Sequence, residues 1–234
     1  MIDCSMLVSV NWVGGWGNIM RHIRGASVAA IVGVFVLLVG LPFASADLVL
    51  NGGFEEPDIS PLLASMVPPG SLTGWTVTNG NIEIVDNAYW QSAEGDQSID
   101  MNAGGHAGSI SQDIATGPGG MYYIDFALTG NWRLGPPTKS MQVWWDGVMV
   151  EQFDITKPVG WSESNMGWQH YRIGKLAAGA GAFTTIEFVS VTDREYGPVL
   201  DDVSVTPEPG TLALMALGLA GLVAARRRRK EDAE

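Results

Sequence analysis

Tryptophan residues in loop-like stretches are the side chains of this sequence whose chemistry is easiest to connect to a ligand. Trp132 and Arg133 lie in a Gly-Asn-Trp-Arg stretch, and Trp161 precedes a serine and a glutamate. Sugar rings stack their apolar C–H faces on indole rings, while carboxylates and amides bond the hydroxyls. We therefore expect Trp132, Arg133 and Trp161 to line a shallow surface for a glycan or another partner. The alternative is that the tryptophans fill a core, as large aromatic side chains commonly do.

Residues that would catalyse a reaction show no local motif. His106 and His170 are the two histidines outside the N-terminal segment, and neither marks a nucleophile with its base. The glycine-rich stretch 104–108 lacks the lysine of a phosphate-binding loop. A glycosidase needs two carboxylates across the scissile bond, and the sequence does not mark such a pair. We expect a binding protein rather than an enzyme.

The stretch that must position these side chains, residues 47–206, reads as an all-β domain. Short runs rich in β-branched and aromatic residues alternate with Gly, Pro and Asn, and long helical periodicity is missing. Asp146-Gly147 between two such runs signals a two-residue hairpin turn. Trp144 and Trp145 are successive before this turn, so one should face the core and the other solvent. We expect a two-sheet antiparallel jelly-roll sandwich. The expected strands lie at 48–50, 75–78, 82–85, 97–101, 108–114, 121–129, 141–145, 148–154, 168–173, 183–191 and 199–205.

The N-terminal end carries a targeting pattern. Two arginines precede an apolar run, 26–41, and the run is followed by Ala44-Ser45-Ala46, whose small side chains suit signal peptidase. We expect residues 1–46 to be a signal peptide with a signal helix, cleaved after Ala46. Met20 is an alternative start of the chain, because the preceding residues are unusual for a signal peptide.

The C-terminal end carries a second targeting pattern. Pro207-Glu208-Pro209 leads into fifteen apolar or small residues, 211–225, and then into a basic run, 226–230. A helix of fifteen residues is about 22 Å long, short of the ~30 Å hydrocarbon core of a bilayer. The basic run should stay on the cytoplasmic side, so the domain before it would face away from the cytoplasm. We expect a short transmembrane helix, either transient or a permanent tail anchor.

Charge and cysteine content exclude several classes of protein. The whole chain has a formal net charge of −12, and residues 47–206 hold six basic and twenty acidic residues. This balance makes nucleic acid an improbable partner. The single cysteine supports neither a disulfide framework nor a zinc finger.

The tripartite tail resembles the PEP-CTERM sorting signal of Gram-negative bacteria. The resemblance rests on Pro207, Glu208 and Pro209, the short apolar segment and the basic run, so that residues 207–234 form the signal. It implies recognition by an exosortase, cleavage near the motif and transfer to the cell envelope, the cell surface or the extracellular matrix.

A second resemblance covers residues 47–206. The opening 48–57, Gly74-Trp75, the segment 95–101 and the closing 199–205 are similar to the choice-of-anchor C family and to galactose-binding-like jelly rolls, including carbohydrate-binding modules. In such jelly rolls the first and last strands lie side by side. The resemblance therefore implies that the segment 51–56 approaches Asp201 and Asp202.

That adjacency suggests a structural calcium ion. Calcium prefers six to eight oxygen ligands, and the resemblance carries over Glu55 and Asp201 as side-chain ligands, with Asp202 in reserve. In a regular strand Asp201 and Asp202 point to opposite faces, so only one should ligate directly. The alternative is that these acids are solvated residues at a rim or in turns.

Three hypotheses on function follow. The first is a non-catalytic surface or matrix protein whose jelly roll binds extracellular polysaccharide. The second is a structural or protein-interaction module without glycan binding, which buried aromatic side chains would favour. The third is an envelope glycoside hydrolase or lyase, which requires two carboxylates about 5 to 10 Å apart in a cleft.

Overall fold

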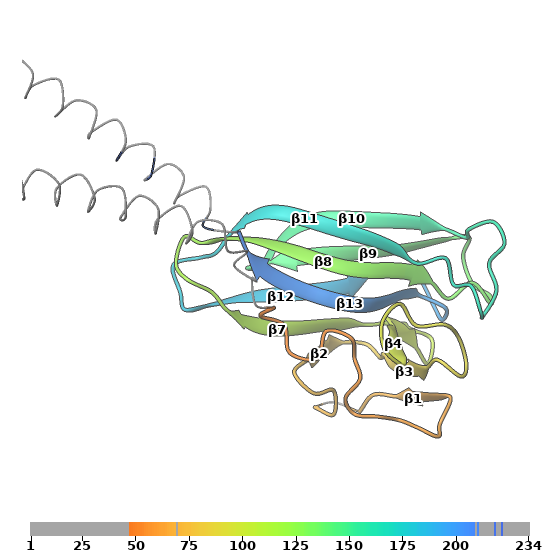
Figure 1. The fold of residues 1–234 in the computed structure, drawn as a ribbon. Helices are drawn as coiled ribbons and strands as arrows, with labels where there is room; N and C mark the ends of the chain where they lie inside the picture. The colour runs from red at the N-terminus through yellow and green to blue at the C-terminus, as the bar shows by residue number, and fades with distance from the viewer. Residues whose placement is uncertain (1–46, 69, 209, 211–217, 219–220, 222–234) are drawn as a thin grey trace, which may run out of the picture. The chain divides into compact units, whose positions relative to one another are not determined.

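Alternating inward and outward side chains build a sandwich of two antiparallel sheets, as expected from the sequence. The structure is a computed structural model that describes residues 47–68, 70–208, 210, 218 and 221. Residues 47–208 contain strands and turns but no helix where they are described. Figure 1 shows the long strands lying in two layers, one behind the other. The strands are β1 (Ala64–Met66), β2 (Thr76–Asn79), β3 (Glu83–Asp86), β4 (Gln97–Asp100), β5 (Asn102–Ala103), β6 (His106–Ala107), β7 (Ser109–Ala115), β8 (Met121–Gly130), β9 (Thr138–Trp145), β10 (Val148–Thr156), β11 (Gln169–Ala177), β12 (Phe183–Ser190) and β13 (Pro198–Pro207).

The strand order shows crossovers between non-consecutive strands, which are typical of a jelly roll. One sheet has six strands in the order β1-β3-β4-β13-β8-β11, and the other has five in the order β10-β9-β12-β7-β2. Neighbouring strands within each sheet pair in antiparallel fashion, and β5 and β6 form a small separate antiparallel pair. The result confirms the predicted all-β jelly-roll class.

The main core lies between the two sheets. In β9 every second side chain is buried, so this strand contributes one face to the core and one to solvent. β8 alternates only in its first half, and all of its residues from Phe126 to Gly130 are buried. Phe126 of β8 contacts Phe188 of β12 edge to face, with ring centroids 5.4 Å apart, and thereby joins the two layers. A second, smaller cluster of Val85, Trp90, Met166 and Val199 is separate from this core.

The first described residues lie beside the last strand, as the resemblance implied. The backbone N–H of Leu48 donates to the carbonyl of Val205, and the N–H of Val203 donates to the carbonyl of Gly52. The segment 48–50 is nevertheless not a strand, which corrects one expected element. The backbone N–H groups of Val49 and Leu50 donate to side-chain oxygens of Asp47 and Gln112, so this segment does not form a continuous backbone ladder.

Two expected elements lie outside the described residues. They are the signal segment 1–46 with its helix and, apart from positions 218 and 221, the C-terminal segment 211–234 with its helix and basic run. Within the part of the chain that the structure describes, no helix is both long and apolar enough to span a membrane.

Candidate functional site

The outer face of the five-stranded sheet carries a partly exposed tryptophan. Trp145 points inward and is buried, whereas its neighbour Trp144 points outward and is partly exposed, so the predicted division between core and solvent holds. Met149, which is 45% exposed, pairs with Trp144 across the β9–β10 hairpin and extends the apolar surface of the indole. Glu187 of β12 pairs with Trp144 on the other side.

A chain of hydrogen-bonded polar side chains continues from this indole along β9 and β10. The Nε1–H of Trp144 donates to Oε1 of Gln142 (3.2 Å), and Nε2 of Gln142 donates to Oε1 of Gln152 (2.9 Å). Nε2 of Gln152 and the hydroxyl of Ser140 both donate to Oδ1 of Asp154, at 3.1 and 2.6 Å. These two hydrogen bonds lower the pKa of the exposed Asp154 carboxyl, and the hydrogen bond from Ser140 has the larger effect. The row formed by Trp144, Gln142, Gln152 and Asp154 is therefore ordered by hydrogen bonds, and it ends at the Asp154 carboxylate.

Two further carboxylates on the same face are held by threonine hydroxyls. The Thr185 hydroxyl donates to Oδ1 of Asp113 (2.6 Å), and the Thr78 hydroxyl donates to Oε1 of Glu187 (2.7 Å). We call the outward surface of this sheet the Trp144 face, defined by Asp113, Gln142, Trp144, Met149, Gln152, Asp154 and Glu187. It combines an apolar ring surface with fixed amides and carboxylates, which is the combination that holds a sugar.

Two of the three sequence-predicted ligand residues, Trp132 and Trp161, lie in loops and are largely enclosed. Trp132 is only 5% exposed and its ring lies beside the ammonium of the buried Lys139. Trp161 packs against both hydrophobic clusters. Within the described residues, Nε1 of each of these two indoles is buried without a hydrogen-bond partner. This burial favours the alternative in which both rings fill the core.

Lys157 brings the two tryptophans together. Its Nζ donates to the carbonyl of Trp132 (3.2 Å) and lies 4.3 Å from the ring centroid of Trp161. Trp132 also lines a cavity of about 250 Å³ between the edge strands β10 and β11, together with Asp154 and Tyr171. Of the predicted residues, two are therefore neighbours.

Arg133 is the predicted residue that remains open to solvent. Its guanidinium lies 4.8 Å from the ring centroid of Tyr89 and forms a 3.0 Å ion pair with Glu163. The side chains of Tyr89 and Glu163 also line a shallow hollow. Gln91 joins the two loops that form it, because its backbone N–H donates to the carbonyl of Glu163 and its Oε1 accepts from the N–H of Met166.

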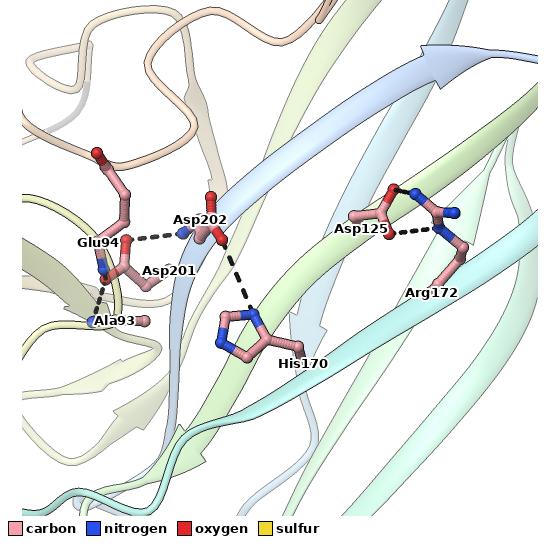
Figure 2. Close-up of polar contacts among 7 residues, drawn as sticks. All are labelled: Ala93, Glu94, Asp125, His170, Arg172, Asp201 and Asp202. Carbon is pink, nitrogen blue, oxygen red and sulfur yellow. Dashed lines mark hydrogen bonds and ion pairs between the residues drawn. The ribbon is translucent and has the colours of Figure 1, made fainter.

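The predicted calcium residues, Glu55 and Asp201, hold opposite ends of the 93–97 segment. Oδ2 of Asp201 accepts the backbone N–H groups of Ala93 and Glu94, at 2.8 and 3.0 Å, as Figure 2 shows. Oε1 of Glu55 accepts the N–H groups at positions 96 and 97, at 2.9 and 3.0 Å. Burial raises the pKa of Asp201 to about 8 and also raises the pKa of Glu55. The backbone N–H donors lower both pKa values, but the effect of burial is larger. Both carboxylates therefore anchor the loop directly.

The outer face of the six-stranded sheet carries ion pairs that connect its strands. Arg172 of β11 donates from Nε to Oδ1 of Asp125 on β8 at 2.6 Å, and from a second nitrogen to Oδ2 at 3.0 Å. His170 lies 3.8 Å from Asp202, the reserve ligand, which sits in a bulge of β13. Figure 2 shows Asp125 and Arg172 on the neighbouring strands β8 and β11, whereas Asp202 of β13 and His170 of β11 face each other across β8. Each of the four side chains therefore has one partner within its pair.

The sorting motif begins inside the sheet. Pro207 is the last residue of β13 and pairs with Tyr122, and the N–H of Glu208 donates to the carbonyl of Met121 (2.7 Å). Pro209 lies outside the described residues. Within the described chain the sandwich and the motif thus meet without an intervening linker.

The fold and the tail together define an exported β-sandwich protein that is sorted to the cell envelope. A family model described as PEP-CTERM protein-sorting motif matches residues 205–229, which confirms the resemblance seen in the tail. A second model, described as Protein of unknown function (DUF642), matches residues 47–206. The chain belongs to this DUF642 family.

Solved structures with a similar fold have low sequence identity. TmCBM61, solved in complex with β-1,4-galactotriose, is 17% identical over 70% of this chain and 100% of its own, with a TM-score of 0.46. The Stig cyclase Fisc from Fischerella sp. TAU is 14% identical over 71% and 99%, with a TM-score of 0.49. A family 35 carbohydrate binding module from Clostridium thermocellum is 15% identical over 61% and 90%, with a TM-score of 0.37. No curated protein matches the chain.

Sequence reasoning did not select the Trp144 face as a site. Its polar members are spread over four strands, β7, β9, β10 and β12, and they meet only through strand pairing. The sequence signal that could have found this face is the alternation along β9, in which Ser140, Gln142 and Trp144 point outward and the residues between them are buried.

Proposed function

We propose that this protein is an exported, non-catalytic surface or matrix protein that binds extracellular polysaccharide on the Trp144 face. The observation that carries the proposal is the partly exposed indole of Trp144, flanked by the hydrogen-bonded row of Gln142, Gln152 and Asp154. An indole stacks on the C–H face of a sugar, and fixed amides and carboxylates bond its hydroxyls.

The shape of the face favours a polymer over a small molecule. Same-side residues of one strand are about 6.6 Å apart, so Ser140, Gln142 and Trp144 extend over about 13 Å along β9. The adjacent strands β10 and β12 widen this surface. An extended chain of sugars can contact the whole row, whereas a single small molecule would bury only a part of it.

The test is retention of the full-length protein, kept in a mild detergent, on a panel of neutral polysaccharides in affinity electrophoresis. We expect retardation by at least one neutral polymer, and a loss of at least about fivefold in affinity for Trp144→Ala, because the stacking contact is removed. Absence of retardation by every polymer, with the protein folded, would overturn the proposal.

The loop containing Arg133 is a second candidate location for the same ligand, as the sequence predicted for Trp132, Arg133 and Trp161. The specific observation in its favour is the exposed Arg133 guanidinium on the Tyr89 ring, beside a hollow. Arg133→Ala separates the two locations, because it should leave binding to the Trp144 face unchanged.

Burial of Trp132 and Trp161 is the observation that favours the alternative function, a structural or protein-interaction module without glycan binding. The retention experiment distinguishes that alternative. Release of soluble sugar from a retained polymer would instead identify a hydrolase or lyase, and our proposal predicts none.

Sorting by an exosortase, after removal of the signal segment by signal peptidase, is part of the proposal. It is supported by the sorting motif at residues 205–229. The apolar segment 211–225 would then anchor the chain in the inner membrane only until processing.

We also propose a structural Ca²⁺ near Glu55 and Asp201. Burial raises the pKa of both carboxyl groups, so positive charge beside them would favour their ionised forms. Among the described residues no group of three His, Cys, Asp or Glu side chains is arranged to hold a metal, so backbone carbonyls and water would complete the ligand set.

Calcium should raise the midpoint of thermal unfolding relative to chelator, and Glu55→Gln should reduce that difference. Equal midpoints in calcium and chelator would contradict the proposal.

A further inference from the structure

The five-stranded sheet that bears the Trp144 face carries acidic side chains on its strands but no exposed basic ones. Across β2, β7, β9, β10 and β12, all of which are described, the single Lys or Arg is Lys139. Lys139 is fully buried, and its Nζ donates to the carbonyl of Leu134 rather than facing outward (3.0 Å). The same strands carry four carboxylates, those of Asp113, Glu151, Asp154 and Glu187.

Three of these carboxylates are positioned to accept hydrogen bonds from a ligand. Asp113, Asp154 and Glu187 each use one oxygen to accept hydrogen bonds from neighbouring side chains, which fixes the orientation of the group. In the described structure the second oxygen of each makes no hydrogen bond. A carboxylate accepts but does not donate, so these oxygens require a donor from the ligand, and a sugar hydroxyl is such a donor.

Some of the donors near Trp144 are committed to the protein. Its own indole N–H and one N–H each of Gln142 and Gln152 point to acceptors in the row. One further N–H on each amide is left for a ligand, and an amide N–H is a neutral donor. A ligand with negative charge would therefore meet three carboxylates and no exposed cation on this sheet.

We propose that the polysaccharide bound on the Trp144 face is uncharged, a hydroxyl-rich polymer without uronate or sulfate groups. The inference rests on the proposed function and narrows its substrate class. Like charges placed together across an interface repel each other, and an anionic group would also lose its hydration without gaining a partner.

The distribution of the cations outside this sheet agrees with that assignment. Arg133 pairs with Glu163, and Arg172 pairs with Asp125 on the other sheet. Neither guanidinium belongs to the five strands that form the Trp144 face. Lys157 follows the end of β10, and its ammonium is engaged with the carbonyl of Trp132 and the ring of Trp161. An anionic chain lying along β9 would therefore meet the carboxylates of Asp113, Asp154 and Glu187, which all repel it.

The experiment uses one polymer in two charge states. The full-length protein in mild detergent is titrated with a neutral polysaccharide that retards it, and with the same polymer after partial oxidation of its C6 hydroxyls to carboxylates. We expect the oxidised form to bind at least about tenfold more weakly at low salt, with the difference shrinking as salt screens the repulsion. Equal or tighter binding of the oxidised form would overturn the inference while leaving polysaccharide binding intact. Failure to bind any neutral polymer would instead count against the proposed function itself.

A charge-reversal variant tests whether the Trp144 face is the source of the selectivity. Glu187→Lys should narrow the difference between the two polymer forms by several fold, because it places a cation beside Trp144. Asp193→Lys makes the same change in net charge at an exposed loop position, and it should leave the difference unchanged. If the two variants have the same effect, the selectivity comes from overall charge and the inference fails.

Discussion

Asp100 is a buried carboxyl whose environment makes the stability of the fold depend on pH. Its Oδ1 accepts the N–H groups of Asn102 and Gly197, and its Oδ2 accepts Nδ2 of Asn131 (2.8 Å). Burial nevertheless raises the pKa of Asp100 to about 7. The folded state therefore binds this proton more tightly than the unfolded state does. Its contribution to stability is complete at low pH and is lost as the pH rises from about 4 to about 7.

Replacing Asp100 by Asn should remove that dependence. We expect the free energy of unfolding of the variant to vary less between pH 4 and pH 7 than that of the wild type. One proton corresponds to a slope of up to about 1.4 kcal/mol per pH unit. Urea unfolding at a series of pH values measures the difference. Asp193→Asn, which removes an exposed carboxylate, is the control, and an identical profile for wild type and Asp100→Asn would refute the assignment.

The loop tryptophans are the residues whose role the sequence left open between a ligand surface and the core. Residue type predicts that an indole can stack on a sugar, but burial depends on which loops cover it. Lys157 donates to the carbonyl of Trp132, 25 residues away, and Trp161 packs against both hydrophobic clusters. No local pattern encodes these contacts. The alternation of Trp144 and Trp145, by contrast, follows from strand geometry alone and was predictable.

At the scale of elements, the β9–β10 hairpin positions Trp144 opposite Met149. Its turn residues, Asp146 and Gly147, have φ of 52° and 75°, as the Asp-Gly signal predicts. A Cβ at Gly147 would meet no atom within 4 Å, so its replacement costs backbone strain alone.

Gly147→Ala should therefore lower the free energy of unfolding by about 1 kcal/mol. Denaturant unfolding at neutral pH provides the measurement. Gly181→Ala is the matched control, because Gly181 is also a loop glycine but has no positive φ and no close contact. Equal stability of the two variants would show that the left-handed turn is not strained by a side chain.

The last strand constrains where the sorting tail can be cut. Pro207 pairs with Tyr122, and Glu208 is bonded to Met121, so the backbone up to Glu208 is held on β8. A peptide bond held in a sheet is a poor substrate until it is released. We therefore expect exosortase processing to leave Glu208 on the mature protein. The mass of the C-terminal peptide from a host with an exosortase tests this, and a terminus at or before Pro207 on a folded domain would contradict it.

Most of the strands were predictable because they alternate with turn residues along the chain. β7, β8 and β12 follow the expected runs, since their alternation is local. The three-residue β1 was missed because its pairing with β3, rather than its composition, makes it a strand. The proximity of the N-terminal segment to β13 came from family resemblance, and no local pattern would have supplied it.

At the scale of the whole molecule, the two sheets present different surfaces. The outer face of the six-stranded sheet holds paired charges, such as Arg172 with Asp125. The Trp144 face holds unpaired carboxylates around an indole. This asymmetry is the basis of our proposal that a ligand binds on the Trp144 face.

The central claim is tested most directly by titrating the full-length protein, Trp144→Ala and Arg133→Ala with one neutral polysaccharide in parallel. We predict that Trp144→Ala weakens binding at least about fivefold without changing the unfolding midpoint, while Arg133→Ala binds like the wild type. Wild-type affinity in Trp144→Ala would contradict the account, and a loss confined to Arg133→Ala would place the ligand at the loops instead.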